Sequence, residues 1–150
     1  MKNFEYIAAT SLTEAESLLS KGKDEKAVSL IAGGTDLLGT LKDKIHPEGP
    51  ETVIDLKSIA GLSYVKADKK GLRIGALTTL REIATHQTIK EKYNLLALAA
   101  RSVASPQIRN MGTLGGNICQ EPRCWYYRAP DNQFHCLRKG GTKCGAILGD

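Results

Sequence analysis

The stretch AVSLIAGGTDLL, residues 27–38, decides the fold of this chain. Its first half, Ala27–Ala32, is a compact run that is typical of a β-strand, and Gly33 and Gly34 interrupt it. The following segment, Leu37–Ile45, is expected to be helical. A strand, a glycine turn and a helix start in succession present free backbone N–H groups to an anion. Alone, the pattern also fits an ordinary tight turn from a strand to a helix.

Working outward from this stretch, strands and helices alternate over roughly the first hundred residues. Ser11 and Glu14 have the spacing of a capping box, which predicts a helix start after the first strand. Asp68–Lys70 is expected to be the turn of a hairpin. Further elements are expected as strands at Phe4–Ala8 and Glu51–Leu56, and as helices at Leu80–His86 and Asn94–Val103, the last one buried and ended by Pro106. This mixture predicts an α+β fold.

Composition narrows the class of protein. The chain has 41% hydrophobic and 25% charged residues, which is typical of a globular domain. Its apolar runs are too short to cross a bilayer, and the N-terminal stretch has no apolar core of a secretory signal. We therefore expect a cytoplasmic protein with no membrane partner. Four cysteines in a reducing compartment indicate metal or redox chemistry more than disulfides.

The positive charge lies mostly in the last third of the chain. Residues 101–150 contribute +4 of the formal net charge of +5. A nucleic-acid interface would need a basic stripe with stacking aromatic side chains, which Trp125 and its neighbours Arg123 and Arg128 imitate only weakly. A site for an anionic cofactor explains the charge as well. No nucleic-acid partner is therefore expected.

A second glycine turn, MGTLGGN, spans Met111–Asn117. The first turn lacks both the lysine of a nucleoside-triphosphate loop and the spacing of a Rossmann fingerprint. Two turns of small residues can nevertheless both bring the backbone close to one ligand. Together they favour a pyrophosphate site, provided that the fold brings them to the same cleft.

Three motifs carry a resemblance to a known family. They are IAGGTDLL (Ile31–Leu38), IGALTTLREI (Ile74–Ile83) and SPQIRNMGTLGGNICQ (Ser105–Gln120). In this order and separation they resemble the FAD-binding medium subunit of the xanthine dehydrogenase or molybdenum hydroxylase family. The resemblance implies an FAD-binding domain of the PCMH type, built from two small α/β lobes at about residues 1–56 and 57–118. A cysteine-rich insertion, residues 119–150, follows as an irregular loop.

The resemblance also implies which residues contact the cofactor. The first turn would embrace the FAD diphosphate through backbone N–H groups and the Thr35 hydroxyl, and the second would approach it from the other lobe. Two of the residues, Thr78 and Asn117, also fit a role in bracing a turn. The full implied set is Ile31, Ala32, Gly33, Gly34, Thr35, Asp36, Leu37, Leu38, Thr78, Gly112, Thr113, Gly116 and Asn117.

The implied function is that of an oxidoreductase subunit. The flavin would pass electrons between iron–sulfur clusters and an acceptor, with a molybdopterin-binding large subunit and a 2Fe–2S small subunit as partners. The isoalloxazine ring performs the chemistry, so no catalytic side chain is expected. Members of the family are considerably longer than 150 residues, so the chain is expected to be truncated or split, with a C-terminal fragment as a further partner.

The cysteines follow the pattern C-x4-C-x11-C-x7-C, at Cys119, Cys124, Cys136 and Cys144. This pattern has no C-x2-C knuckle of the kind that most structural zinc sites use. The segment resembles an insertion in one branch of the family, which includes 4-hydroxybenzoyl-CoA reductase and periplasmic aldehyde oxidoreductase. That resemblance implies a 4Fe–4S cluster on Cys124, Cys136 and Cys144, with a fourth ligand after Asp150 or at Cys119.

Other interpretations of the cysteines stay open. An all-cysteine zinc site would make the chain a non-catalytic, zinc-stabilised binding module that keeps the fold. Plain reduced thiols or a disulfide pair are further alternatives. His135 next to Cys136 is expected to be an exposed loop residue, and Trp125, Tyr126 and Tyr127 are expected to pack around the site.

Overall fold

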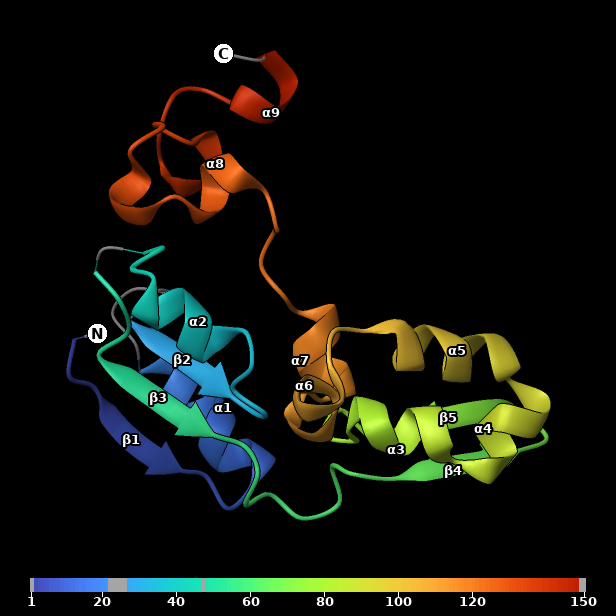
Figure 1. The fold of residues 1–150 in the computed structure, drawn as a ribbon. Coiled ribbons are helices and arrows are strands. Elements are labelled where there is room, and N and C mark those ends of the chain that lie inside the picture. Colours follow the sequence, from blue (N-terminus) through green and yellow to red (C-terminus); the bar gives the residue numbers. More distant parts are fainter. Residues whose placement is uncertain (1, 22–26, 47, 149–150) are drawn as a thin grey trace.

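The computed structural model describes residues 2–21, 27–46 and 48–148. Figure 1 shows two lobes side by side, with the last third of the chain passing from the second lobe back over the first. In the described residues, none of the helices has the length and apolar character needed to span a membrane.

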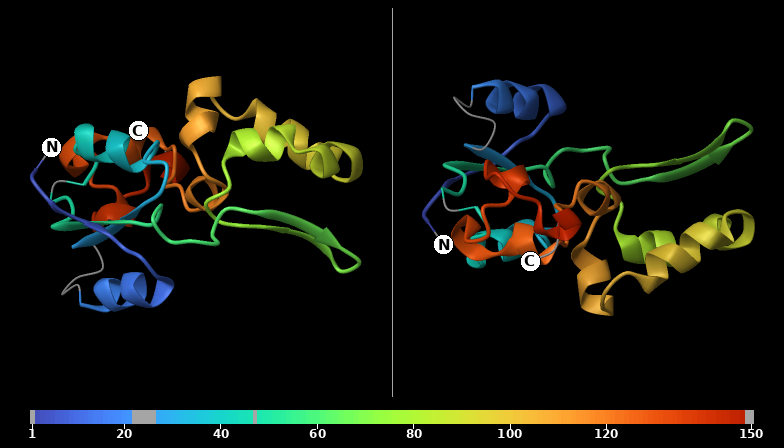
Figure 2. Two further views of the ribbon diagram at one scale, coloured as in Figure 1. Left: turned by 90° about the horizontal axis from the view of Figure 1, so that it is seen from below. Right: turned by 90° about the horizontal axis from the view of Figure 1, so that it is seen from above.

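The first lobe is a three-stranded parallel sheet in the order β1-β3-β2. Helices α1 and α2 lie on opposite faces of this sheet (Figure 2). Ser11 caps α1 by accepting a hydrogen bond from the Glu14 N–H, as the capping-box spacing predicts. The elements of this lobe are β1 (Glu5–Ala8), α1 (Leu12–Ser20), β2 (Val28–Ile31), α2 (Leu37–Lys42) and β3 (Thr52–Asp55).

The parallel sheet places the first glycine turn. All three strands point the same way, so their carboxyl ends, at Ala8, Ile31 and Asp55, lie at one edge of the sheet. The turn of residues 32–36 leaves the sheet at this edge. Ligands of open parallel sheets bind outside the carboxyl ends of the strands, so the turn stands where a ligand is expected.

The second lobe packs helices against the β4–β5 hairpin around the buried residues Ile83, Ile89, Ala97 and Ala100. Thr79 and Glu82 form a complete capping box at the start of α3. The elements are β4 (Val65–Asp68), β5 (Gly71–Ile74), α3 (Leu80–Thr85), α4 (Gln87–Lys92), α5 (Asn94–Ser102), α6 (Pro106–Met111) and α7 (Leu114–Ile118).

Three expectations about the helices need correction. The helix after the first glycine turn ends at Lys42 and not at Ile45. Helix α5 is only half buried, since Leu95 is 82% exposed and Ala97 faces the core. Pro106 not only follows α5 but also occupies the first turn of α6, a position where its missing N–H costs nothing.

The cysteine-rich segment, residues 119–148, contains short helices and is not one irregular loop. Tyr127 and Cys136 pack against Ile45 of the first lobe. The Nζ of Lys139 donates to the carbonyl oxygens of Ile45 at 2.8 Å and Ala129 at 2.7 Å. These contacts fix the segment on the first lobe; its elements are α8 (Trp125–Arg128), η1 (Pro130–Asn132), η2 (Leu137–Lys139) and α9 (Gly145–Leu148).

Candidate cofactor-binding cleft

A cavity of about 840 Å³ lies between the two lobes and the cysteine-rich segment. This volume is within the usual range for cofactor and ligand sites. The first glycine turn contributes Ile31 to Leu37, and the second contributes Gly112, Thr113, Gly116 and Asn117. The cavity therefore collects both glycine turns, although they lie about 75 residues apart in the sequence.

The two turns touch each other at Gly33. A Cβ added to Gly33 would lie 1.8 Å from the carbonyl oxygen of Met111, closer than real Cβ contacts allow. A Cβ on Gly112 would lie 3.6 Å from the Thr35 hydroxyl oxygen. Only a residue without a side chain permits this approach, so Gly33 is required for the lobes to meet.

The first turn presents unused backbone donors. In the described part of the chain, the N–H groups of residues 33–37 have no hydrogen-bond acceptor. Gly34 has a left-handed φ of 72°, a backbone conformation found in the nests in which consecutive amides face an anion. Helix α2 has only six residues, so the free amides of the turn, rather than the dipole of this helix, are the candidate anion-binding feature.

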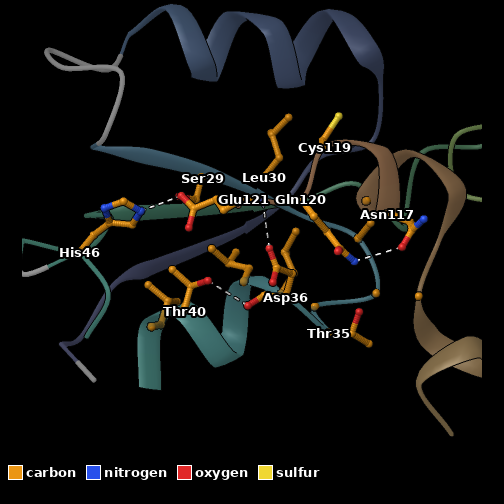
Figure 3. Close-up of a pocket in the computed structure, with 18 of the residues that line it drawn as sticks. Ser29, Leu30, Thr35, Asp36, Thr40, His46, Asn117, Cys119, Gln120 and Glu121 are labelled. Atoms are coloured by element: carbon orange, nitrogen blue, oxygen red, sulfur yellow. Dashed lines mark hydrogen bonds and ion pairs between the residues drawn. The ribbon is translucent and has the colours of Figure 1, made fainter. Parts of the chain in front are cut away.

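The second turn differs, because the N–H groups of Gly115, Gly116 and Asn117 are already bonded within the chain. The N–H of Gly115 donates to the Ala76 carbonyl at 2.8 Å, and the N–H of Gly116 donates to the Thr113 hydroxyl at 3.2 Å. The N–H of Asn117 donates to the Thr113 carbonyl at 2.9 Å. This turn therefore offers the cleft a close wall and the Asn117 side chain, whose Oδ1 accepts from Gln120 (Figure 3).

Two residues of the expected cofactor set lie outside the cavity lining. The Thr78 side chain is buried, and its hydroxyl both donates to the Tyr64 carbonyl and accepts from the Tyr64 N–H, each at 3.0 Å. This is the bracing role that the sequence had left open for Thr78. Leu38 faces Gly34, and a Cβ added to that glycine would lie 3.2 Å from the leucine side chain. The other residues of the set line the cavity.

Asp36 anchors the cysteine-rich segment to the first turn. Although Asp36 is the N-cap of α2, its carboxylate makes no capping bond. It accepts instead from the guanidinium groups of Arg123 at 2.7 Å and Arg128 at 2.8 Å, and from the Glu121 N–H at 3.3 Å. Figure 3 shows the contact between Asp36 and the backbone of Glu121. The Asp36 carboxylate is therefore held by partners from the cysteine-rich segment.

A polar cluster forms another part of the cleft wall. His46 Nε2 lies 2.6 Å from Glu121 Oε1, and the Tyr127 hydroxyl lies 3.3 Å from the same nitrogen. Burial and the nearby negative charge of Glu121 raise the pKa of Tyr127 to about 12. The other carboxylate oxygen, Glu121 Oε2, is buried and lacks a hydrogen-bond partner in the described residues. A ligand N–H or O–H would satisfy this acceptor.

The four cysteines do not converge on one point. Cys124 packs against the cluster of Ile45, Tyr127 and the buried Cys136, and Cys144 follows Lys143, which pairs with Cys136 in an isolated bridge. Cys119 ends α7, is exposed and lines the cleft. Among the described residues, no three His, Cys, Asp or Glu side chains lie close enough together to hold a metal ion.

Several residues of the site carry no signal in the sequence. His46, Glu121 and Tyr127 belong to segments without periodicity, and only the three-dimensional contact joins them. The partners of Asp36 lie between 85 and 92 residues away along the chain. The sequence alone shows only that residues 123 and 128 are positively charged.

Comparison with known proteins agrees with this arrangement. The family described as the FAD binding domain in molybdopterin dehydrogenase matches residues 2–124. The carbon monoxide dehydrogenase from Hydrogenophaga pseudoflava that lacks the Mo-pyranopterin moiety superposes with a TM-score of 0.71 at 36% identity, covering 78% of this chain and 39% of that one. This level of structural similarity supports both the two-lobed PCMH-type fold and its α/β character.

The alignments with two curated relatives cover different lengths of this chain. The nicotinate dehydrogenase FAD-subunit of Eubacterium barkeri is 43% identical over 118 residues, 79% of this chain and 39% of that protein. The aldehyde oxidoreductase FAD-binding subunit PaoB of Escherichia coli K12 is 38% identical over 150 residues, 99% of this chain and 45% of that protein. The second alignment therefore includes the cysteine-rich segment, and the chain spans about two fifths of the relatives' length. The chain belongs to the family of FAD-binding domains of molybdopterin dehydrogenases.

Proposed function

We propose that this chain binds FAD in the cleft, as the flavin-carrying part of an oxidoreductase of the molybdenum hydroxylase family. The single observation that carries the proposal is the meeting of Gly33 with Met111, which closes a cavity around a row of free amides. The N–H groups of residues 33–37 would donate to the diphosphate oxygens. Neutral amides that face a dianion give strong, charge-assisted hydrogen bonds at no desolvation cost to a side-chain charge.

The residues around the cleft fit a dinucleotide. The second turn approaches without side chains at Gly112 and Gly116, so it leaves room for a ligand beside the first turn. The unpartnered Glu121 Oε2 fits a donor on the polar end of the ligand. Bound FAD would supply the electron transfer, and the side chains of this chain would bind and orient it.

The wider assembly is part of the same proposal. Relatives named as an FAD-subunit, a medium chain and a subunit of a dehydrogenase complex indicate that this domain works among other subunits. We propose a molybdopterin-binding large subunit and a 2Fe–2S small subunit as partners, with electrons passing through the flavin to an acceptor. A C-terminal fragment as partner and a cytoplasmic location stay predictions.

We also propose that the cysteine-rich segment carries a 4Fe–4S cluster, as in the branch with 4-hydroxybenzoyl-CoA reductase. Two observations support it: Cys124, Cys136 and Cys144 lie in one folded segment, and the alignment with PaoB runs through that segment. The ligands would have to move together, because no three of them converge in the described structure. A cluster-free segment that is stabilised by the Ile45–Tyr127 packing is the competing account.

A competition experiment tests the cofactor proposal. The full chain is titrated with FAD, and quenching of flavin fluorescence reports binding. We expect saturable binding at one site that ADP displaces, because ADP carries the diphosphate, while riboflavin does not displace it. Absence of saturable binding, or displacement by riboflavin as efficient as by ADP, would overturn the proposal.

A further inference from the structure

We infer that Lys57, held by Asp55, is a positioning residue that orients the amides of the first glycine turn; Tyr6 in turn holds Asp55. The inference rests on the proposed binding of a diphosphate by that turn. None of the three residues lines the cleft, so their effect on a ligand passes through the backbone of residues 31–33.

Two carbonyl groups at the end of β2 are held by the segment that follows β3. The Ile31 carbonyl accepts a hydrogen bond from the Leu56 N–H at 3.0 Å. The next carbonyl, that of Ala32, accepts from the Nζ of Lys57 at 3.2 Å. The segment just after β3 therefore fixes the direction of two successive peptide groups where the chain leaves the sheet.

The direction of the Ala32 carbonyl also sets the direction of the Gly33 N–H. The described chain contains no cis peptide bond, so the Ala32 carbonyl and the Gly33 N–H point in opposite directions. The carbonyl points to Lys57, which is outside the cleft, whereas Ala32 and Gly33 line the cleft. The Gly33 N–H, which has no acceptor among the described residues, is thereby turned to the side away from Lys57.

The peptide group between Ala32 and Gly33 needs a partner that fixes its orientation. Glycine adopts both signs of φ at little cost, so a peptide group followed by Gly33 and Gly34 can flip easily. A flipped group would present the Ala32 carbonyl oxygen, instead of the Gly33 N–H, to an anion. The hydrogen bond from Lys57 stabilises the orientation in which the amides form one row.

Lys57 is itself held by the Asp55 carboxylate. Its Nζ lies 2.9 Å from Asp55 Oδ2, and its own N–H donates to Asp55 Oδ1 at 2.9 Å. The Tyr6 hydroxyl donates to Asp55 Oδ2 as well. The Asp55 side chain is only 5% exposed, whereas that of Lys57 is 51% exposed. A buried carboxylate with these partners is a fixed counter-charge, and it confines the end of a lysine that would otherwise move freely in water.

The network also explains the ionisation of Asp55. Burial alone would raise its pKa, but the hydrogen bonds from Tyr6 and Lys57 and the charge of Lys57 outweigh burial and lower the pKa. The carboxylate is therefore ionised at neutral pH, which keeps the ion pair with Lys57 in place.

The test compares three variants of the full chain. Lys57→Met removes the donor and keeps most of the apolar stem, Lys57→Arg restores a donor, and Lys90→Met on the exposed face of α4 is the matched control. We expect Lys57→Met to weaken FAD and ADP binding about tenfold, the effect of one charge-assisted hydrogen bond. Lys57→Arg should recover most of the loss, and Lys90→Met should bind like the wild type.

A second measurement keeps the inference separate from the proposed function. Backbone amide spectra of the ligand-free chain should show the Gly33 N–H resonance displaced in Lys57→Met and restored in Lys57→Arg, with that of Gly115 unchanged. This result is expected whether or not FAD binds. An unchanged Gly33 resonance overturns the inference, as does FAD binding by Lys57→Met that equals the wild type. Failure of the wild-type chain to bind FAD overturns the proposed function instead.

Discussion

Gly33 and Met111 approach so closely that a Cβ on Gly33 would lie 1.8 Å from the Met111 carbonyl oxygen. Through this contact the turn after β2 meets the end of α6, and the two lobes enclose one cleft. The free amides of residues 33–37 lie at this junction. The lobe contact and the proposed binding of a diphosphate therefore depend on the same few residues.

Gly33→Ala tests this dependence. Its Cβ forces the lobes apart, so we expect FAD affinity to fall at least about tenfold, or 1.4 kcal/mol, with a lower melting temperature. Gly39→Ala on α2 is the control, because a Cβ at this position would meet nothing within 4 Å. That change should stabilise the helix by about 0.5–1 kcal/mol. Equal FAD affinity in the two variants would show that the lobe contact is irrelevant to binding.

Gly34 has a different requirement. Its φ of 72° is strained for residues with a side chain, above all β-branched ones. A Cβ on Gly34 would face the side chains of Ile31 and Leu38, so the cost comes from backbone strain and not from a blocked phosphate. We expect Gly34→Val to lose about 1–3 kcal/mol of unfolding free energy and most of its FAD affinity. Gly34→Asn should lose less unfolding free energy than Gly34→Val, because asparagine tolerates this φ. Equal losses of the two variants in chemical denaturation would refute the strain argument.

The ion pair between Asp36 and Arg128 should couple the cysteine-rich segment to the first lobe. The two side chains are 17% and 20% exposed, so water screens them only in part. A double-mutant cycle with Asp36→Asn and Arg128→Gln, read by urea unfolding, should give a coupling of about 1 kcal/mol. The Lys2–Glu48 pair, with side chains 62% and 90% exposed, is the control and should show little coupling. Additive effects at Asp36 and Arg128 would mean that the pair does not fix the segment.

Stability should fall at alkaline pH because of Tyr127. Its pKa is about 12 in the folded chain, against about 10 in the unfolded chain, so the folded state holds the proton more tightly. Unfolding free energy should therefore drop between about pH 10 and 12, by up to about 2 kcal/mol. Urea unfolding of Tyr127→Phe should show a flatter alkaline limb than the wild type. The hydrogen bond to Asp55 raises the pKa of Tyr6, and this effect is present in both the wild type and Tyr127→Phe. The contribution of Tyr127 is therefore the difference between the two pH profiles of unfolding free energy. Identical profiles would contradict the raised pKa of Tyr127.

The cysteines predict a specific pattern of iron content. After anaerobic reconstitution with iron and sulfide, Cys136→Ser should lose iron and keep the FAD affinity of the wild type. Cys119→Ser, at the exposed end of α7, should keep its iron if the fourth ligand lies elsewhere. Unchanged iron in Cys136→Ser would remove Cys136 from the ligand set. Stoichiometric zinc without iron in the wild type would favour the zinc-stabilised module.

Local signals in the sequence were enough for most elements of the two lobes. The Ser11–Glu14 spacing and the Asp68–Lys70 turn have local causes, so the helix cap and the hairpin appear where they were predicted. The exposure of Leu95 could not be predicted from the sequence. An apolar residue on a helix is buried only where another element of the fold packs over it, and the sequence does not show which element that is. The fold class itself depended on the order of strands and helices, which sequence patterns do show.

The cleft could be predicted only in part. The two glycine turns were visible as motifs, but their contact at Gly33 is a property of the fold. The difference between free amides in the first turn and occupied amides in the second depends on Ala76, which no pattern connects with Gly115. The same holds for Lys57, whose role requires β3 to lie beside β2.

The most direct test of the central claim is a backbone amide NMR titration of the full ¹⁵N-labelled chain with FAD. The claim predicts that the largest shifts fall on residues 33–37, whose N–H groups lack acceptors in the described structure. The amides of Gly115 and Gly116, which are already bonded within the second lobe, should move less. FAD binding that leaves the resonances of residues 33–37 in place would contradict the claim.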